Sequence, residues 1–138
     1  MKGMKKQKLN ADNKVQRSVQ ESSIVHRLET LMDLAGPQFV HELIEVFLQI
    51  GRKDFDTMKK ALNSSSPEKF LAAAQSLKAT SLNMGASELS GFCKIAGSSK
   101  TFASKIKSQE ALENIEIHLL KAEDFLRGYI KETHSSAS

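Results

Sequence analysis

The chain has 138 residues, of which 40% are hydrophobic and 26% charged, an ordinary composition for one globular domain. Seven glycines and two prolines supply little turn chemistry for a β-rich fold, and the aromatic content of 6% predicts an aliphatic core. No apolar run approaches the roughly 20 residues that span a bilayer, and the first 20 residues lack the apolar block of a signal peptide. The single cysteine, Cys93, cannot form an intramolecular disulfide, so a cytoplasmic location is expected.

The formal net charge of +4 is concentrated at one end of the chain. Residues 1–20 carry six Lys or Arg against one Asp, which leaves 14 basic and 15 acidic side chains for residues 21–138. A basic segment poor in apolar residues is typical of a disordered tail, and neither nucleic-acid binding nor membrane binding is expected of it. Residues 133–138 are predicted to form a second disordered tail, which leaves residues 21–132 for the folded domain.

The first two predicted helices meet at Gly36 and Pro37. Glycine tolerates the conformations that end a helix, and proline suits the first position of the next one. Before this junction, Ser22 or Ser23 is expected to cap a short amphipathic helix. Its apolar residues recur with helical period: Ile24, Leu28, Leu31 and Leu34 or Ala35. After the junction a long helix is predicted as far as about Leu62. Its apolar stripe is expected to face a bundle interior: Phe39, Val40, Leu43, Phe47, Ile50 or Gly51, Phe55, Met58 and Leu62.

The third predicted helix begins at Pro67, with Ser66 as its cap, and ends at Gly85. Its inward-facing residues are Phe70, Ala74, Leu77, Ser81 and Met84. A fourth helix is predicted over about 86–98. A basic loop over 98–107 follows it, with Phe102 as an apolar anchor.

Ser108 is expected to cap the last helix, which is predicted to run to about Ile130. Its core positions keep a 3-4 spacing: Leu112, Ile115, Leu119, Ala122, Leu126 and Tyr129. Helices of such lengths, joined by short loops, build an antiparallel bundle. We therefore predict an all-α fold, in which the second to fifth helices form an antiparallel four-helix bundle and the additional N-terminal helix packs across one end.

The third helix carries the most informative run of the chain, Ala74–Ala86, which reads AQSLKATSLNMGA. With a histidine in place of Gln75, this run resembles the signature of the histidine-containing phosphotransfer (HPt) family of two-component phosphorelays. That signature is His-x-x-Lys-Gly-Ser/Ala-Ser, followed by apolar residues and a Gly-Ala helix end. The resemblance extends over roughly 28–130, and it implies the same four-helix bundle and a response-regulator receiver domain as the partner.

The departure at Gln75 changes what such a domain can do. Phosphorelay requires a nitrogen lone pair that attacks phosphorus and later leaves, and the imidazole of histidine supplies one near neutral pH. The amide nitrogen of glutamine only donates hydrogen bonds. Lys78 is kept, whereas Ala79 stands where most relatives have glycine. The sequence thus predicts an HPt-like signalling module that docks receiver domains but carries no phosphate itself, and no enzyme.

The docking surface implied by the resemblance follows from helical phase. Gln75 lies about 160° from the inward-facing Leu77, so its side chain is expected on the outer face of the helix. The residues three, four and seven positions further on share that face: Lys78, Ala79 and Leu82. The preceding long helix is expected to add Gln49, Arg52 and Asp56 to the rim of this surface.

The other histidines do not replace the missing one, because His26, His41, His118 and His134 lack the Lys-small-Ser pattern. His41 with Glu45 supplies too few ligands for a metal site, so neither a metal nor a cofactor is expected. A hybrid sensor kinase is a second candidate partner, and a monomer is expected. Two alternatives stay open: a natural phosphotransfer protein whose histidine was changed to Gln75, and a helical-bundle adaptor unrelated to phosphorelay.

Overall fold

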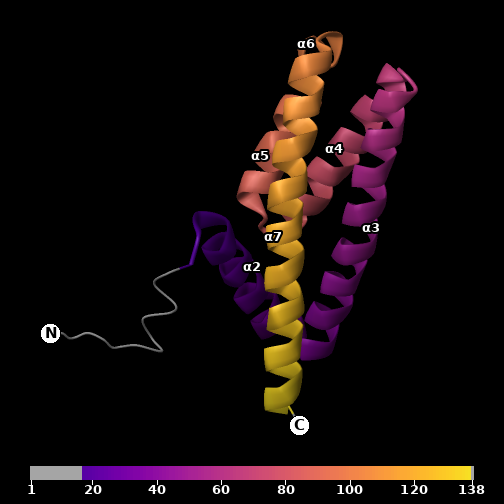
Figure 1. The fold of residues 1–138 in the computed structure, drawn as a ribbon. Helices are drawn as coiled ribbons and strands as arrows, with labels where there is room; N and C mark the ends of the chain where they lie inside the picture. Colours follow the sequence, from indigo (N-terminus) through magenta and orange to yellow (C-terminus); the bar gives the residue numbers. More distant parts are fainter. Residues whose placement is uncertain (1–16, 138) are drawn as a thin grey trace, which may run out of the picture.

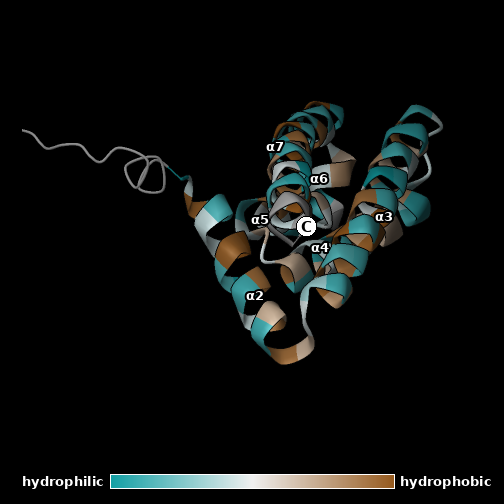
Figure 2. Ribbon diagram, turned by 90° about the horizontal axis from the view of Figure 1, so that it is seen from below, coloured by the Kyte–Doolittle hydropathy of each residue, from teal (hydrophilic) through white to brown (hydrophobic). Residues whose placement is uncertain are grey.

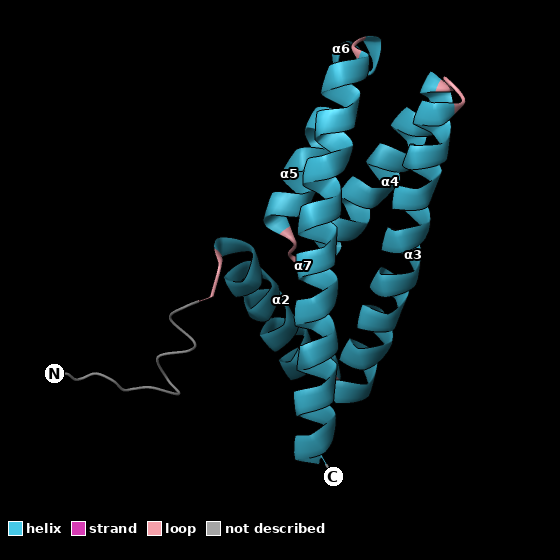
Figure 3. Ribbon diagram, in the orientation of Figure 1, coloured by secondary structure: helices cyan, strands magenta, loops and turns pink. Residues whose placement is uncertain are grey.

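The computed structural model describes residues 17–137, and over this range the chain forms helices and no strand (Figures 1 and 3). The all-α helical bundle predicted from the sequence is thereby confirmed. None of these helices combines the length and the apolarity that crossing a bilayer requires. The prediction of a disordered tail concerns mainly residues 1–16, which lie outside the described residues. The helices are α2 (Val19–Ala35), α3 (Pro37–Asn63), α4 (Pro67–Met84), α5 (Ser87–Ala96), α6 (Ser99–Ala103) and α7 (Lys105–Ala137).

Four of the helices enclose the core. Helix α3 packs against α4, α4 against α5, α5 against α7, and α7 against α3. Helix α2 lies obliquely beside this group and contacts all four of its helices (Figure 1). Hydrophobic and hydrophilic residues alternate along the helices in Figure 2, as amphipathic helices require.

The core is built mainly from aliphatic side chains and three phenylalanines, Phe47, Phe55 and Phe70. Phe102 packs against it, with its ring centroid 5.1 Å from that of Phe70. The predicted burial of Phe70, Leu77 and Cys93 is confirmed. Burial raises the pKa of the Cys93 thiol to about 12, with a smaller contribution from a nearby aspartate, so this cysteine stays protonated at neutral pH.

Helix α2 begins earlier than predicted. Ser18 caps it: its hydroxyl accepts from the Glu21 N–H at 3.0 Å, and the Glu21 carboxylate accepts from the Ser18 N–H at 3.1 Å. The expected cap at Ser22 or Ser23 is therefore wrong, and the predicted domain boundary at residue 20 falls within the helix. Gln20 is buried, and its side chain accepts from the Leu89 N–H and donates to the His118 carbonyl. Those tertiary partners hold the first turn of α2 against α5 and α7.

The predicted loop over 98–107 contains helix α6, and α7 begins at Lys105. The cap of α7 is Ser104, whose hydroxyl accepts from the Lys107 N–H at 3.2 Å. The prediction that Ser108 caps this helix is wrong, because Ser108 is buried and its hydroxyl donates to the Thr101 carbonyl at 2.9 Å. At its other end α7 continues to residue 137, beyond the predicted end of the domain at residue 132.

Gly85 ends α4 in a left-handed conformation with φ = 84°. A Cβ atom at this position would stand 2.8 Å from the Ser23 carbonyl oxygen of α2, a backbone atom that cannot rotate away. We expect Gly85→Ala to lower the free energy of unfolding by about 2 kcal/mol, because strain and a close contact coincide. Urea denaturation measures the difference. Gly91 is the control: it is helical with open space around it, so Gly91→Ala should raise stability by about 0.5 kcal/mol. Equal effects at the two positions would contradict the prediction.

Candidate functional site

The outer face of α4 presents the residues that the motif singled out. Gln75 and Ala79 are exposed, Leu82 is 51% exposed and Lys78 is half-buried. These four residues are here called the α4 ridge. Lys78, Ala79 and Leu82 lie three, four and seven positions after Gln75, on the side of α4 away from the buried Leu77. The predicted exposure is confirmed for Gln75 and Ala79, and Lys78 is partly covered.

One motif residue lies beneath the ridge. Ser81 is fully buried, and within residues 17–137 its hydroxyl has no hydrogen-bond partner. A buried hydroxyl without a partner destabilises a fold by about 1–3 kcal/mol relative to a satisfied one. Ser81 is therefore a core residue, and it contributes no atom to the surface of the ridge.

Helix α3 flanks the ridge, but with other residues than those predicted. The Ser76 hydroxyl donates to the Asp54 carboxylate at 2.6 Å, which sets Asp54 level with the Gln75 position. Val46 and Ile50, on the same side of α3, are 48% and 38% exposed. A small depression of about 150 Å³ separates the two helices here. It is lined by Leu43, Val46, Phe47, Ile50, Thr80, Asn83 and Met84.

The sequence analysis missed this flank because it placed Leu43 and Phe47 in the core stripe, with Ile50 as an alternative to Gly51, and it assigned no role to Val46. Gly51, and not Ile50, is the position that faces the interior: a Cβ there would touch Leu77 and Leu119. Phe39 is likewise 45% exposed instead of buried. A half-exposed apolar strip could have been predicted from the 3-4 spacing of Phe39, Leu43, Val46 and Ile50.

Arg52, predicted at the rim of the ridge, lies on the other side of α3. Its guanidinium donates to the Glu123 carboxylate of α7 at 2.8 and 3.3 Å. The hydrogen bonds to Glu123 raise the pKa of Arg52, and the charges of Asp56 and Glu116 add to the effect. Gln49 is exposed and, three positions before Arg52, shares its side of α3. The structure therefore does not bring Gln49, Arg52 or Asp56 together with Gln75.

At its other end the ridge meets α2. Leu82 lines a hollow of about 380 Å³ together with polar side chains of α2, among them His26 and Arg27. Both of these residues are exposed. The ridge thus has an apolar flank toward α3 and a basic, polar neighbour toward α2.

The remaining histidines take structural positions. His41 is half-buried, and its Nε2 lies 2.7 Å from the Thr133 hydroxyl, so it joins α3 to α7. His118 lies against the ring of Phe92, with its Nδ1 2.9 Å from the Asn114 carbonyl. Among residues 17–137, no three His, Cys, Asp or Glu side chains group in a way that could hold a metal ion. The side chain of His134 lies outside the described residues.

Comparisons with protein-family models, with characterised proteins and with solved structures find no match for this chain. The candidate site is therefore argued from the residues of α4 and their surroundings.

Proposed function

We propose that the chain is an HPt-like signalling module that docks a response-regulator receiver domain on the α4 ridge and carries no phosphate itself. The observation that supports this most strongly is the exposure of Gln75 and Ala79 in the middle of α4, within a run that keeps the HPt spacing. In this proposal the module is not an enzyme, and it acts in the cytoplasm, where receiver domains are found.

The surface suits a transient partner with an acidic pocket. Lys78 supplies a cation beside the small side chain of Ala79, and an acidic pocket complements a cation. Leu82 at one end, with Val46 and Ile50 on the flank, offers apolar area that ordinary surfaces seldom gather. An interface limited to these residues is small, so we expect an affinity in the micromolar range.

The absence of a nucleophile at position 75 determines the role that we propose for the module in the relay. A module that occupies the receiver without accepting its phosphoryl group competes with active phosphotransfer proteins for that receiver. Inhibition of phosphate flow by competition is therefore the effect we expect. The genomic codon for residue 75 separates a natural module of this kind from an altered phosphotransfer protein.

Reversal of the charge at Lys78 tests the docking surface. We expect Lys78→Glu to weaken receiver binding at least 10-fold, because a carboxylate would then face an acidic pocket. Thermal stability should change little, since within residues 17–137 Lys78 has no ion pair or side-chain hydrogen bond to lose. Isothermal titration against a panel of receiver domains from the same organism provides the measurement.

Lys121→Glu is the matched control, because Lys121 is an exposed lysine of α7 and the change in net charge is identical. It should leave receiver binding within about twofold of the unaltered chain. Equal losses in both variants would show that only overall charge matters. If no receiver bound the unaltered chain, the adaptor interpretation would replace the one proposed.

A further inference from the structure

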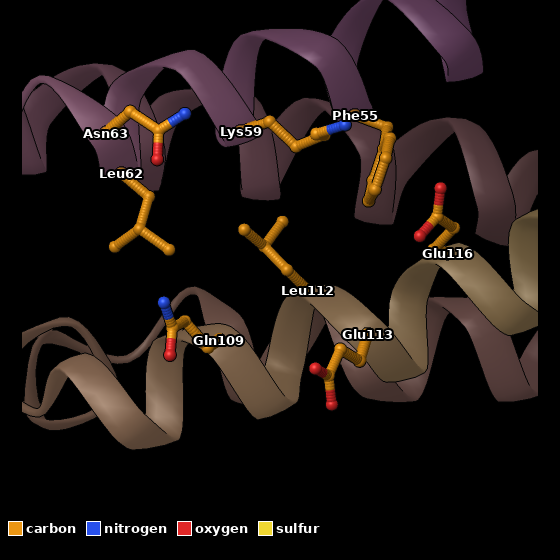
Figure 4. A pocket seen from close by; sticks show the side chains of 8 residues that line it. All are labelled: Phe55, Lys59, Leu62, Asn63, Gln109, Leu112, Glu113 and Glu116. Carbon is orange, nitrogen blue, oxygen red and sulfur yellow. The ribbon is translucent and has the colours of Figure 1, made fainter.

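A second surface lies between α3 and α7, on the side of α3 that holds Arg52. Here the two helices border a groove of about 320 Å³. Figure 4 shows Leu62 and Leu112 projecting into the space between the helices, with Phe55 at one end. Polar side chains surround this apolar floor: Lys59, Asn63, Gln109, Glu113 and Glu116. The groove therefore combines apolar contact area with hydrogen-bonding groups on both walls.

The α7 wall of the groove is acidic. Within residues 17–137 neither Glu113 nor Glu116 takes part in a salt bridge. Two cations stand nearby: Arg52 pairs with Glu123, and the Lys59 ammonium, on the α3 wall of the groove, lies 5.8 Å from the centre of the Phe55 ring. Two carboxylates beside an apolar floor are complementary to a basic segment that also carries apolar side chains.

The chain itself contains such a segment. Residues 1–16 carry five lysines and one aspartate, whereas the remaining residues carry 15 basic and 15 acidic side chains. The segment also supplies apolar residues among its lysines, and Leu9 directly follows Lys8. Residues 94–107 also carry four lysines and no acidic residue among apolar side chains, but they are folded into α5, α6 and the start of α7 and are not free to enter the groove.

The start of the described chain lies close enough for this segment to reach the groove. Gln20 is fixed to the His118 carbonyl of α7, and Glu116 is only two positions away on the same helix. The groove lies on the α3 side of α7, so the chain must cross about one helix diameter, roughly 10 Å. The nine residues from Leu9 to Arg17 can span up to about 30 Å, so Leu9 is within reach.

We propose that residues 1–16 bind the α3–α7 groove of the same molecule. Leu9 packs on the floor formed by Phe55 and Leu112, and the neighbouring lysines face Glu113 and Glu116. This contact fastens α3 to α7 through charge, and it leaves the α4 ridge, on the other side of α3, open. The proposal is therefore independent of receiver docking.

Paramagnetic relaxation measures the contact in the full chain. A nitroxide is attached to Asn10→Cys, in a chain where the buried Cys93 is replaced by alanine. At 25 mM NaCl, the amide signals of Phe55, Leu112 and Glu116 should lose at least half of their intensity. At 500 mM NaCl the intensity should return, because salt screens the charges of an exposed contact. Undiminished signals at low salt would overturn the proposal, as would a loss that vanishes on dilution, which would assign the groove to a second copy.

Two pairs of substitutions separate a specific contact from general attraction. Glu113→Gln with Glu116→Gln removes two charges from the groove and should abolish the signal loss. Glu110→Gln with Asp124→Asn removes two charges from exposed positions of α7 outside the groove lining and should leave the loss unchanged. The amide spectrum of each variant reports directly whether the bundle is folded. Equal recovery in the two variants would show that the segment senses net charge alone, and the proposal would fail.

Discussion

Replacement of Gln75 by histidine should give the chain the ability to accept phosphate from its receiver partner. The imidazole nitrogen would form a bond to phosphorus while the bond between phosphorus and the aspartate oxygen of the receiver breaks, and the carboxylate leaves. Position 75 is exposed, and Lys78 lies one turn further along the same helix, so the substitution places a nucleophile on a surface that already suits the partner. Incubation with the phosphorylated receiver should yield acid-labile phosphate on the variant and none on the unaltered chain.

A histidine elsewhere on α4 is the matched control. Ala72 is exposed one turn before Gln75, so Ala72→His presents the same nucleophile at a different place on the helix. It should remain unphosphorylated, because phosphoryl transfer requires the nucleophile within near-attack distance. A Gln75→His variant that bound its receiver normally but gained no phosphate would contradict the idea of a lost phosphotransfer site.

Ala79 offers a second test of the same site. In the Gln75→His background, Ala79→Gly should increase the transfer rate, because removal of the methyl group lets the partner approach the imidazole more closely. The glycine should destabilise α4 by about 1 kcal/mol. Rate and stability therefore change in opposite directions, which separates better access from better folding.

The helix boundaries that could be predicted are those set by local chemistry. Gly36 with Pro37, Ser66 with Pro67, and Gly85 mark the junctions of α2, α3 and α4, and the structure has each junction there. The start of α2 could not be placed in the same way. Gln20 is polar, and its burial depends on the Leu89 N–H and the His118 carbonyl, partners about 70 and 100 positions away.

In the candidate site, too, the features set by local sequence could be predicted, and those set by tertiary packing could not. The exposure of Gln75 follows from the phase of α4 alone, because Leu77 fixes the inward direction. Which side of α3 faces α4 depends on how the two helices pack. If the inward-facing position is Gly51 and not Ile50, the inward direction of α3 rotates by about 100°. Arg52 was predicted at the rim of the ridge from its level along the helix, but its side chain faces α7.

The pairing of Arg52 with Glu123 connects the middle of α3 to α7 by two hydrogen bonds, and its two ends differ in exposure. The Glu123 side chain is 4% exposed, whereas that of Arg52 is 35% exposed. Removal of a partner from a buried pair destabilises proteins by roughly 3–5 kcal/mol, because the other charge stays buried and unpaired. Water that reaches the Arg52 end lowers this figure here.

We therefore expect unequal effects from the two halves of the pair. Arg52→Gln should lower the free energy of unfolding by about 2–3 kcal/mol, because the Glu123 carboxylate remains buried without its cation. Glu123→Gln should cost only about 1 kcal/mol, since its amide oxygen still accepts from Arg52 and the guanidinium is already partly exposed to solvent. The double change Arg52→Leu with Glu123→Leu should lie closer to the unaltered chain than Arg52→Gln does. Denaturant unfolding of the four proteins measures these differences. A larger loss from Glu123→Gln than from Arg52→Gln would mean that the buried member of the pair is not the carboxylate.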